Sequence, residues 1–181
     1  EIERNRNDVN LAVETLAFQL IRQMDSRYRS FTVIDPRKLG GNFKFLRRKE
    51  NVVIDEDEVK KTIQSQYSES IRIVRECLLH YDSIDEYNVS TGEFQPYRIL
   101  VIADFPYAHR DLLDKLDSLI YNAKEAGLLV MMTYDKSIEV GSSNLSRVLS
   151  ILDQLVTIVP SEDMQTYRVK GTGQDDFYNR E

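Results

Sequence analysis

The chain has 181 residues, of which 41% are hydrophobic and 30% charged, and its formal net charge is −6. This length suits one domain, which should bury ~70% of the surface that its unfolded chain exposes, and the acidic balance excludes a uniformly basic surface that coats nucleic acid. A single cysteine excludes an internal disulfide and a thiolate metal cage, and the apolar runs are too short to cross a bilayer. We therefore expect one cytoplasmic domain over residues 1–181, with a polar tail over 161–181 and no membrane segment.

The first half of the chain predicts two helices and two short strands. Apolar residues at spacings of three and four predict a helix over 7–24. A β-branched apolar run predicts a buried strand over 30–35, and a second short strand is expected over 52–54. The acidic residues 55–58 favour a helix start, because carboxylates stabilise a helix N-terminus, and apolar spacing predicts that this helix covers 57–82.

The second half begins with a turn-rich break over 90–97 and then alternates strands with helices. The elements predicted there are strands over 98–104, 128–135 and 155–160, helices over 111–127 and 141–155, and a strand-like piece over 166–169. The main strands are apolar on both faces and helices separate them. This pattern predicts an α/β fold with a mostly parallel sheet that helices cover on both sides.

Three aspartates, Asp35, Asp104 and Asp135, stand at the ends of three predicted strands. The carboxyl ends of parallel strands meet at one edge of a sheet, and ligands bind there in open α/β sheets. We therefore expect these carboxylates to share one edge, with Asp104 as a candidate metal ligand. The alternative is that Asp104 only caps the turn that follows it. In that case Asp104→Asn is predicted to leave stability nearly unchanged or to improve it.

No phosphate-binding loop accompanies this edge in the sequence. None of the seven glycines is followed by lysine, so the Gly-x-x-x-x-Gly-Lys-Ser/Thr loop that cradles phosphates is absent. The Gly-x-Gly-x-x-Gly and Gly-x-Ser-x-Gly motifs are absent as well. The sequence therefore predicts no cofactor held by this chain alone.

Four segments occur in a characteristic order: "FTVIDPRKLGGNF", "YDSIDEYN", "PYRILVIADFP" and "AGLLVMMTYD". In this order the chain resembles the FtsK/SpoIIIE-like branch of the P-loop ATPases over residues 10–160, read from just after the phosphate loop. More narrowly, it resembles the degenerate FtsK-like unit of large proteins that carry two such ATPase units. The resemblance implies a RecA-like, P-loop NTPase-type three-layer fold that lacks the phosphate-loop strand. It also implies that the chain is a fragment of a longer protein.

The resemblance implies roles for single residues. Asp104 matches the Walker B aspartate that holds Mg²⁺ through water, and Phe105 stands where the family has the glutamate that polarises the attacking water. A phenylalanine cannot accept a proton. Thr133 falls near the family's sensor position, with Tyr134 in place of the expected glutamine. ATP and Mg²⁺ are therefore cofactors only of a full-length protein that supplies a phosphate loop.

A basic segment follows the first strand and supports a second kind of interpretation. Six cations fall within thirteen residues without an acid: Arg37, Lys38, Lys44, Arg47, Arg48 and Lys49. With Phe43 and Phe45 between them, they suit a phosphate backbone and stacked bases. The alternative is a solvated loop whose phenylalanines pack inward and whose charge the acids 55–58 neutralise.

Three hypotheses for function follow. The first is a non-catalytic, degenerate FtsK/SpoIIIE-like ATPase domain with an assembly or regulatory role in a larger DNA-associated protein. The second is part of an active ATP-driven double-stranded DNA translocase whose phosphate loop lies upstream or on another subunit. The third is a nucleic-acid-binding module acting through residues 37–49. The expected partners are the other domains of the parent protein, further copies of the chain and weakly bound DNA.

Overall fold

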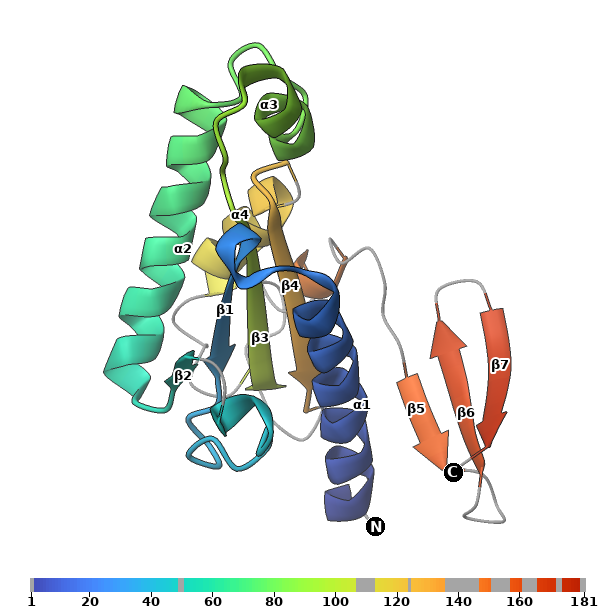
Figure 1. Ribbon diagram of the computed structural model, residues 1–181. Helices are drawn as coiled ribbons and strands as arrows, with labels where there is room; N and C mark the ends of the chain where they lie inside the picture. The colour runs from blue at the N-terminus through green and yellow to red at the C-terminus, as the bar shows by residue number, and fades with distance from the viewer. Residues whose placement is uncertain are drawn as a thin grey trace.

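The computed structural model describes residues 2–48, 51–106, 113–123, 125–135, 147–150, 157–160, 166–171 and 174–179 (Figure 1). The helices are α1 (Ile2–Gln23), α2 (Glu56–Glu76), α3 (Ile84–Thr91) and α4 (Leu113–Ala123), with short 3-10 helices η1 (Ser26–Tyr28) and η2 (Leu46–Arg48). The strands are β1 (Arg29–Ile34), β2 (Asn51–Val53), β3 (Tyr97–Phe105), β4 (Leu128–Tyr134), β5 (Thr157–Pro160), β6 (Thr166–Gly171) and β7 (Gln174–Asn179).

The first four strands form one parallel sheet in the order β2-β1-β3-β4. In register, Val33 of β1 lies opposite Val52 on one side and Val101 on the other, and Val101 lies opposite Met131. These apolar and β-branched side chains suit a strand that is covered on both faces. The predicted α/β fold with a mostly parallel sheet is confirmed.

Helices cover the sheet on both faces, so the fold has three layers. On one face, α2 and α4 pack against alternate strand residues through Ile63 and Leu119. On the other face, α1 packs through Ala17, together with Phe43 from the segment after β1. Figure 1 shows α1 and α2 on opposite sides of the strands. Among the described helices, none is long and apolar enough to span a membrane.

The helix predicted over 57–82 ends earlier than expected. α2 ends at Glu76, with Cys77 as its C-cap. A further helix that the sequence analysis did not predict, α3, begins after Ser83, whose hydroxyl accepts a hydrogen bond from the Glu86 amide at 3.2 Å. The prediction that the long helix reaches residue 82 is therefore wrong, and the break predicted over 90–97 begins only after Thr91.

The strand predicted over 155–160 does not join the parallel sheet. In the structure β5 pairs antiparallel with β6, and β6 pairs antiparallel with β7, which gives a separate three-stranded sheet. The tail over 161–181, expected to be polar with one strand-like piece, contributes two of these strands. The predicted helix over 141–155 lies mostly outside the described residues, and its residues 147–150 are helical.

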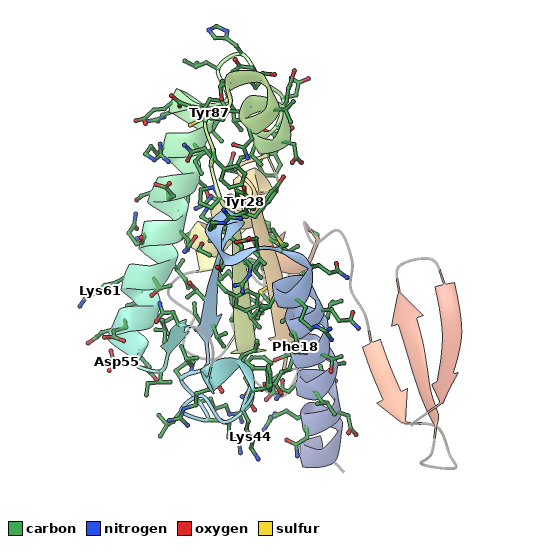
Figure 2. The ribbon with its side chains drawn as sticks, viewed as in Figure 1. Phe18, Tyr28, Lys44, Asp55, Lys61 and Tyr87 are labelled. Atoms are coloured by element: carbon green, nitrogen blue, oxygen red, sulfur yellow. The ribbon has the colours of Figure 1, made fainter. Side chains whose placement is uncertain are left out.

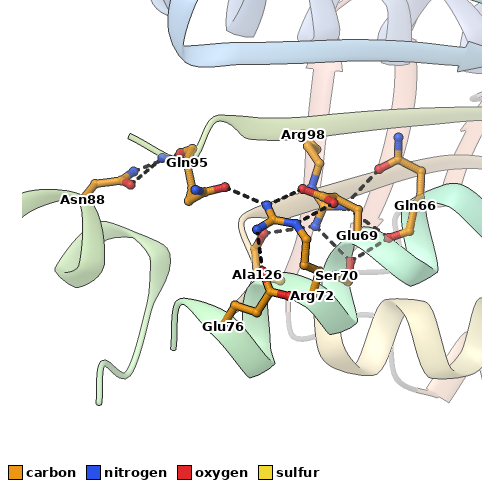
Figure 3. Close-up of polar contacts among 9 residues, drawn as sticks. All are labelled: Gln66, Glu69, Ser70, Arg72, Glu76, Asn88, Gln95, Arg98 and Ala126. Carbon is orange, nitrogen blue, oxygen red and sulfur yellow. Dashed lines mark hydrogen bonds and ion pairs between the residues drawn. The ribbon is translucent and has the colours of Figure 1, made fainter. Parts of the chain in front are cut away.

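A buried arginine joins the layers at the amino-terminal end of β3 (Figure 3). Arg98 is 5% exposed, and it donates hydrogen bonds to the Ser70 hydroxyl at 2.9 Å and to the Gln66 and Ala126 carbonyl oxygens at 3.2 and 3.1 Å. Burial lowers the pKa of Arg98. This side chain therefore fixes β3 to α2 and to the turn before β4, at the end of the sheet away from the aspartates.

The two outer strands of the parallel sheet, β2 and β4, differ in length. β2 has three residues, whereas β4 has seven and carries neither a charge nor a proline. The central strand β3 is buried from Arg98 to Phe105, but Leu129 of β4 is 46% exposed. Within the described part of the chain, no strand pairs with the second edge of β4.

Candidate functional site

Three aspartates, two of them buried, meet at the carboxyl edge of the parallel sheet. Asp35 directly follows β1, Asp104 is the last residue but one of β3, and Asp135 directly follows β4. Because β1, β3 and β4 are parallel neighbours, their carboxyl ends lie side by side. Asp35 is 0% exposed and Asp104 is 2% exposed, so charged groups at this edge need compensation from the protein.

A β-bulge in β3 sets the direction of Asp104. Ile102 pairs with Met132 and Phe105 pairs with Tyr134, so β3 has one more residue than β4 over this stretch. Asp104 lies in this bulge. Its φ is 49°, a left-handed conformation that aspartate tolerates better than most residues. Its backbone amide donates a hydrogen bond to the Thr133 hydroxyl at 2.9 Å. Thr133, which the resemblance places near the sensor position, is 4% exposed, and its hydroxyl holds the bulge.

Asn42 joins two of the carboxylates. Its backbone amide and its side-chain amide each donate to Asp35 at 2.9 Å, and the side-chain amide also donates to Asp104 at 3.1 Å. Asn10 of α1 in turn donates to the Asn42 side-chain oxygen at 2.8 Å. Burial raises the pKa of Asp35, and the nearby Asp104 adds to this, although the hydrogen bonds from Asn42 act in the opposite direction.

Two arginines bring positive charge to the other two carboxylates. Arg6 of α1 places its Nε 3.3 Å from Asp104 Oδ1 and also forms an ion pair with Asp135. Arg37, from the segment after β1, places Nη1 2.5 Å from Asp135 Oδ2 and 3.9 Å from Asp104 Oδ2. Both guanidinium groups thus lie between Asp104 and Asp135. The sequence analysis did not identify Arg6, Asn10 or Asn42 as members of this site.

The carboxylate oxygens of Asp104 face side chains of this chain. A magnesium ion requires near-octahedral oxygen ligands and usually keeps several waters. Here Asp104 Oδ1 faces Arg6, and Asp104 Oδ2 faces Asn42 and Arg37. Among the residues that the structure describes, no three or more histidine, cysteine or acidic side chains are arranged to hold a metal. Phe105, next in the chain, is 0% exposed and lies in the core.

The basic segment after β1 is folded rather than extended. Phe43 is 0% exposed in the core beneath α1, and Phe45 meets the Phe18 ring edge-on with centroids 4.6 Å apart. The Glu14 carboxylate accepts hydrogen bonds from the Phe45 and Leu46 amides at 2.6 and 3.1 Å. Of the two phenylalanines that the alternative interpretation packs inward, Phe43 does so, whereas Phe45 stays 41% exposed.

The predicted DNA-contacting cations are distributed unequally. Arg37 faces the aspartates, whereas Lys38, Lys44 and Arg47 are exposed near the same end of the molecule, where Figure 2 labels Lys44. Lys49 and the side chain of Arg48 lie outside the described residues.

Comparison with known proteins gives matches in structure only. No protein-family model matches the sequence, and no curated protein matches it. ATPase domains 2 and 3 of EssC from Geobacillus thermodenitrificans match 94% of this chain, with 12% identity and a TM-score of 0.66. The cytoplasmic domain of the type VII secretion ATPase EccC from Thermomonospora curvata matches 93%, with 14% identity and a TM-score of 0.66. The conjugation coupling protein TcpA, in its monomer form with ATPγS, matches 84%, with 16% identity and a TM-score of 0.56.

This chain spans only part of each of these proteins: 36% of the EssC chain, 23% of the EccC chain and 52% of the TcpA chain. These structural neighbours are FtsK/SpoIIIE-type P-loop ATPases. The resemblance that the sequence predicts is therefore confirmed at the level of the fold: the chain has the α/β fold of the FtsK/SpoIIIE-type P-loop ATPases.

Proposed function

We propose that this chain is a non-catalytic domain with an ATPase fold, serving assembly or regulation within a larger protein. One observation carries the proposal: Arg6 and Arg37 supply the positive charge beside Asp104, the residue that matches the Walker B aspartate. Phe105, where a glutamate would polarise water, is buried in the core. These features support a domain that has the fold of an ATPase but does not itself hydrolyse ATP.

In this proposal the chain acts as one domain of a larger protein. The structural neighbours are longer than this chain, which supports a role as one domain among several. The proposed partners are the other domains of the parent protein and further copies of the chain, in the cytoplasm. ATP and Mg²⁺ belong to the parent protein in this proposal, where a phosphate loop elsewhere in the polypeptide supplies their contacts.

Isothermal titration calorimetry of the 181-residue chain with Mg-ATP tests the proposal directly. The phosphate loop supplies most polyphosphate contacts in such folds, so we expect no measurable heat of binding. Far-UV circular dichroism must show the same sample to be folded. A dissociation constant in the low micromolar range would contradict the proposal.

The second candidate is a part of an ATP-driven double-stranded DNA translocase. The gathering of Asp35, Asp104 and Asp135 at the ligand-binding edge favours it, as does the ATPase fold. The two candidates separate in the parent protein. Asp104→Asn should leave its DNA-dependent ATPase rate unchanged if this domain is non-catalytic, and should abolish the rate if Asp104 holds Mg²⁺. Circular dichroism at the assay temperature must show that the variant stays folded.

A further inference from the structure

The two halves of α1 are attached to the rest of the domain in different ways. In the C-terminal half, Val13, Ala17 and Leu20 pack into the hydrophobic core on one face of the sheet. In the N-terminal half, Arg6 and Asn10 reach the carboxyl edge through ion pairs and a hydrogen bond. The C-terminal half is therefore held by apolar burial, and the N-terminal half by charge.

Arg6 supplies positive charge to carboxylates that the sheet brings together. Among the residues that the structure describes, Asp35, Asp104 and Asp135 gather at this edge, and Arg6 and Arg37 lie beside Asp104 and Asp135. Withdrawal of Arg6 would remove one of these two positive charges from the edge. The position of the first turns of α1 is thus coupled to the charge of the sheet edge.

A buried amide adds a second contact beside Arg6. Asn10 is 2% exposed, and its side-chain amide donates a hydrogen bond to the Asn42 oxygen at 2.8 Å. Asn42 in turn donates to Asp35 and Asp104. The closed arrangement is therefore held by the Arg6 ion pairs and by this hydrogen bond.

We propose that residues 2–10 of α1 form a latch that Arg6 closes over the carboxyl edge. When the latch is closed, Asp104 and Asp135 share Arg6 and Arg37, and Asp104 is only 2% exposed. When it opens, α1 stays anchored through its C-terminal half, and Asp104 and Asp135 become accessible to solvent. The inference rests on the proposed function and deepens it, because it identifies a contact at the same edge that can open and close.

Hydrogen–deuterium exchange of the 181-residue chain, followed by mass spectrometry without nucleotide, tests the latch. Arg6→Gln should speed amide exchange over residues 5–10 by at least about tenfold, because exchange reports the local opening equilibrium. Exchange over residues 14–23 should stay within about twofold of the wild-type rate, since the apolar anchor is unchanged. Asp135→Asn should reproduce this local pattern from the other side of the ion pair.

Two further variants keep the test decisive. Arg22→Gln, in the same helix but over the Phe18 ring, should leave exchange at residues 5–10 unchanged. Arg6→Lys keeps the positive charge and should restore part of the protection. Equal acceleration along the whole of α1, or no change at residues 5–10 in Arg6→Gln, would overturn the latch. Neither result depends on whether the chain binds Mg-ATP, so failure of the latch and failure of the proposed function are separate outcomes.

Discussion

Replacing Asp104 with asparagine is expected to lower the free energy of unfolding by about 2–3 kcal/mol. Asp104 is 2% exposed, and it accepts a hydrogen bond from Asn42 at 3.1 Å and faces Arg6 at 3.3 Å. Because Asp104 is buried and ion-paired, we expect its substitution to lower stability. This differs from the prediction made from the sequence for a residue that only caps a turn.

The magnitude follows from what remains after the substitution. Removal of one partner from a buried ion pair costs about 3–5 kcal/mol when the other charge is left unpaired. Here Arg6 and Arg37 both keep Asp135, and the amide oxygen of the introduced side chain can still accept from Asn42. The cost should therefore approach that of lost charge-assisted hydrogen bonds, about 1.5–3 kcal/mol each. For a domain of this size, the melting temperature should fall by about 4–12 °C.

Urea unfolding followed by far-UV circular dichroism measures this change. The midpoint should fall while the slope with denaturant stays the same, since the surface exposed on unfolding is unchanged. Asp82→Asn is the matched control, because this aspartate is exposed, and it should stay within about 0.5 kcal/mol of wild type. An Asp104→Asn chain as stable as wild type would refute the reasoning that the arginine pair is bound to an ionised Asp104.

Three other experiments test separate features. Burial raises the pKa of Asp35, so the folded state binds more protons than the unfolded state, and stability falls as pH rises through the folded-state pKa. Asp35→Asn should remove that fall; urea midpoints that keep the wild-type pH dependence would contradict it. Gly127→Ala should cost about 1–3 kcal/mol more than Gly92→Ala, because both have positive φ but only at Gly127 would the new Cβ lie 2.8 Å from another side chain; equal thermal melts would exclude the clash. Lys44→Ala with Arg47→Ala should flatten the salt dependence of non-specific duplex binding by up to ~0.9 log units per contact, measured by fluorescence anisotropy; an unchanged slope would place the contact elsewhere.

The strand pattern was sufficient to predict the sheet and the edge at which the aspartates meet. Period and composition predict that Asp35, Asp104 and Asp135 follow buried parallel strands, and the structure brings these residues to one edge. This part of the prediction succeeds because parallel strands leave little choice about where their carboxyl ends lie.

The partners of these aspartates could not be predicted from local patterns. Arg6 pairs with a residue 129 positions away, and no spacing rule connects the two. Asn42 sits in a segment whose two glycines and many cations suggest only a loop. The α2–α3 boundary did have a local signal, the Ser83-x-x-Glu86 capping pattern, but the continuing apolar spacing through Leu78 and Tyr81 masked it.

The outer strand β4 affects how readily the isolated protein should aggregate. An unpaired edge strand without charge or proline can act as a template on which other chains add strands. Among the described residues no strand pairs with the outer edge of β4, and its Leu129 is 46% exposed. Concentrated solutions of the 181-residue chain should therefore scatter light increasingly with time, at a rate that rises steeply with concentration. Leu129→Lys places a charge on this strand and should delay the scattering without a change in the far-UV circular dichroism spectrum. Storage at low protein concentration, at a pH that keeps the net charge of the chain high, should also delay aggregation.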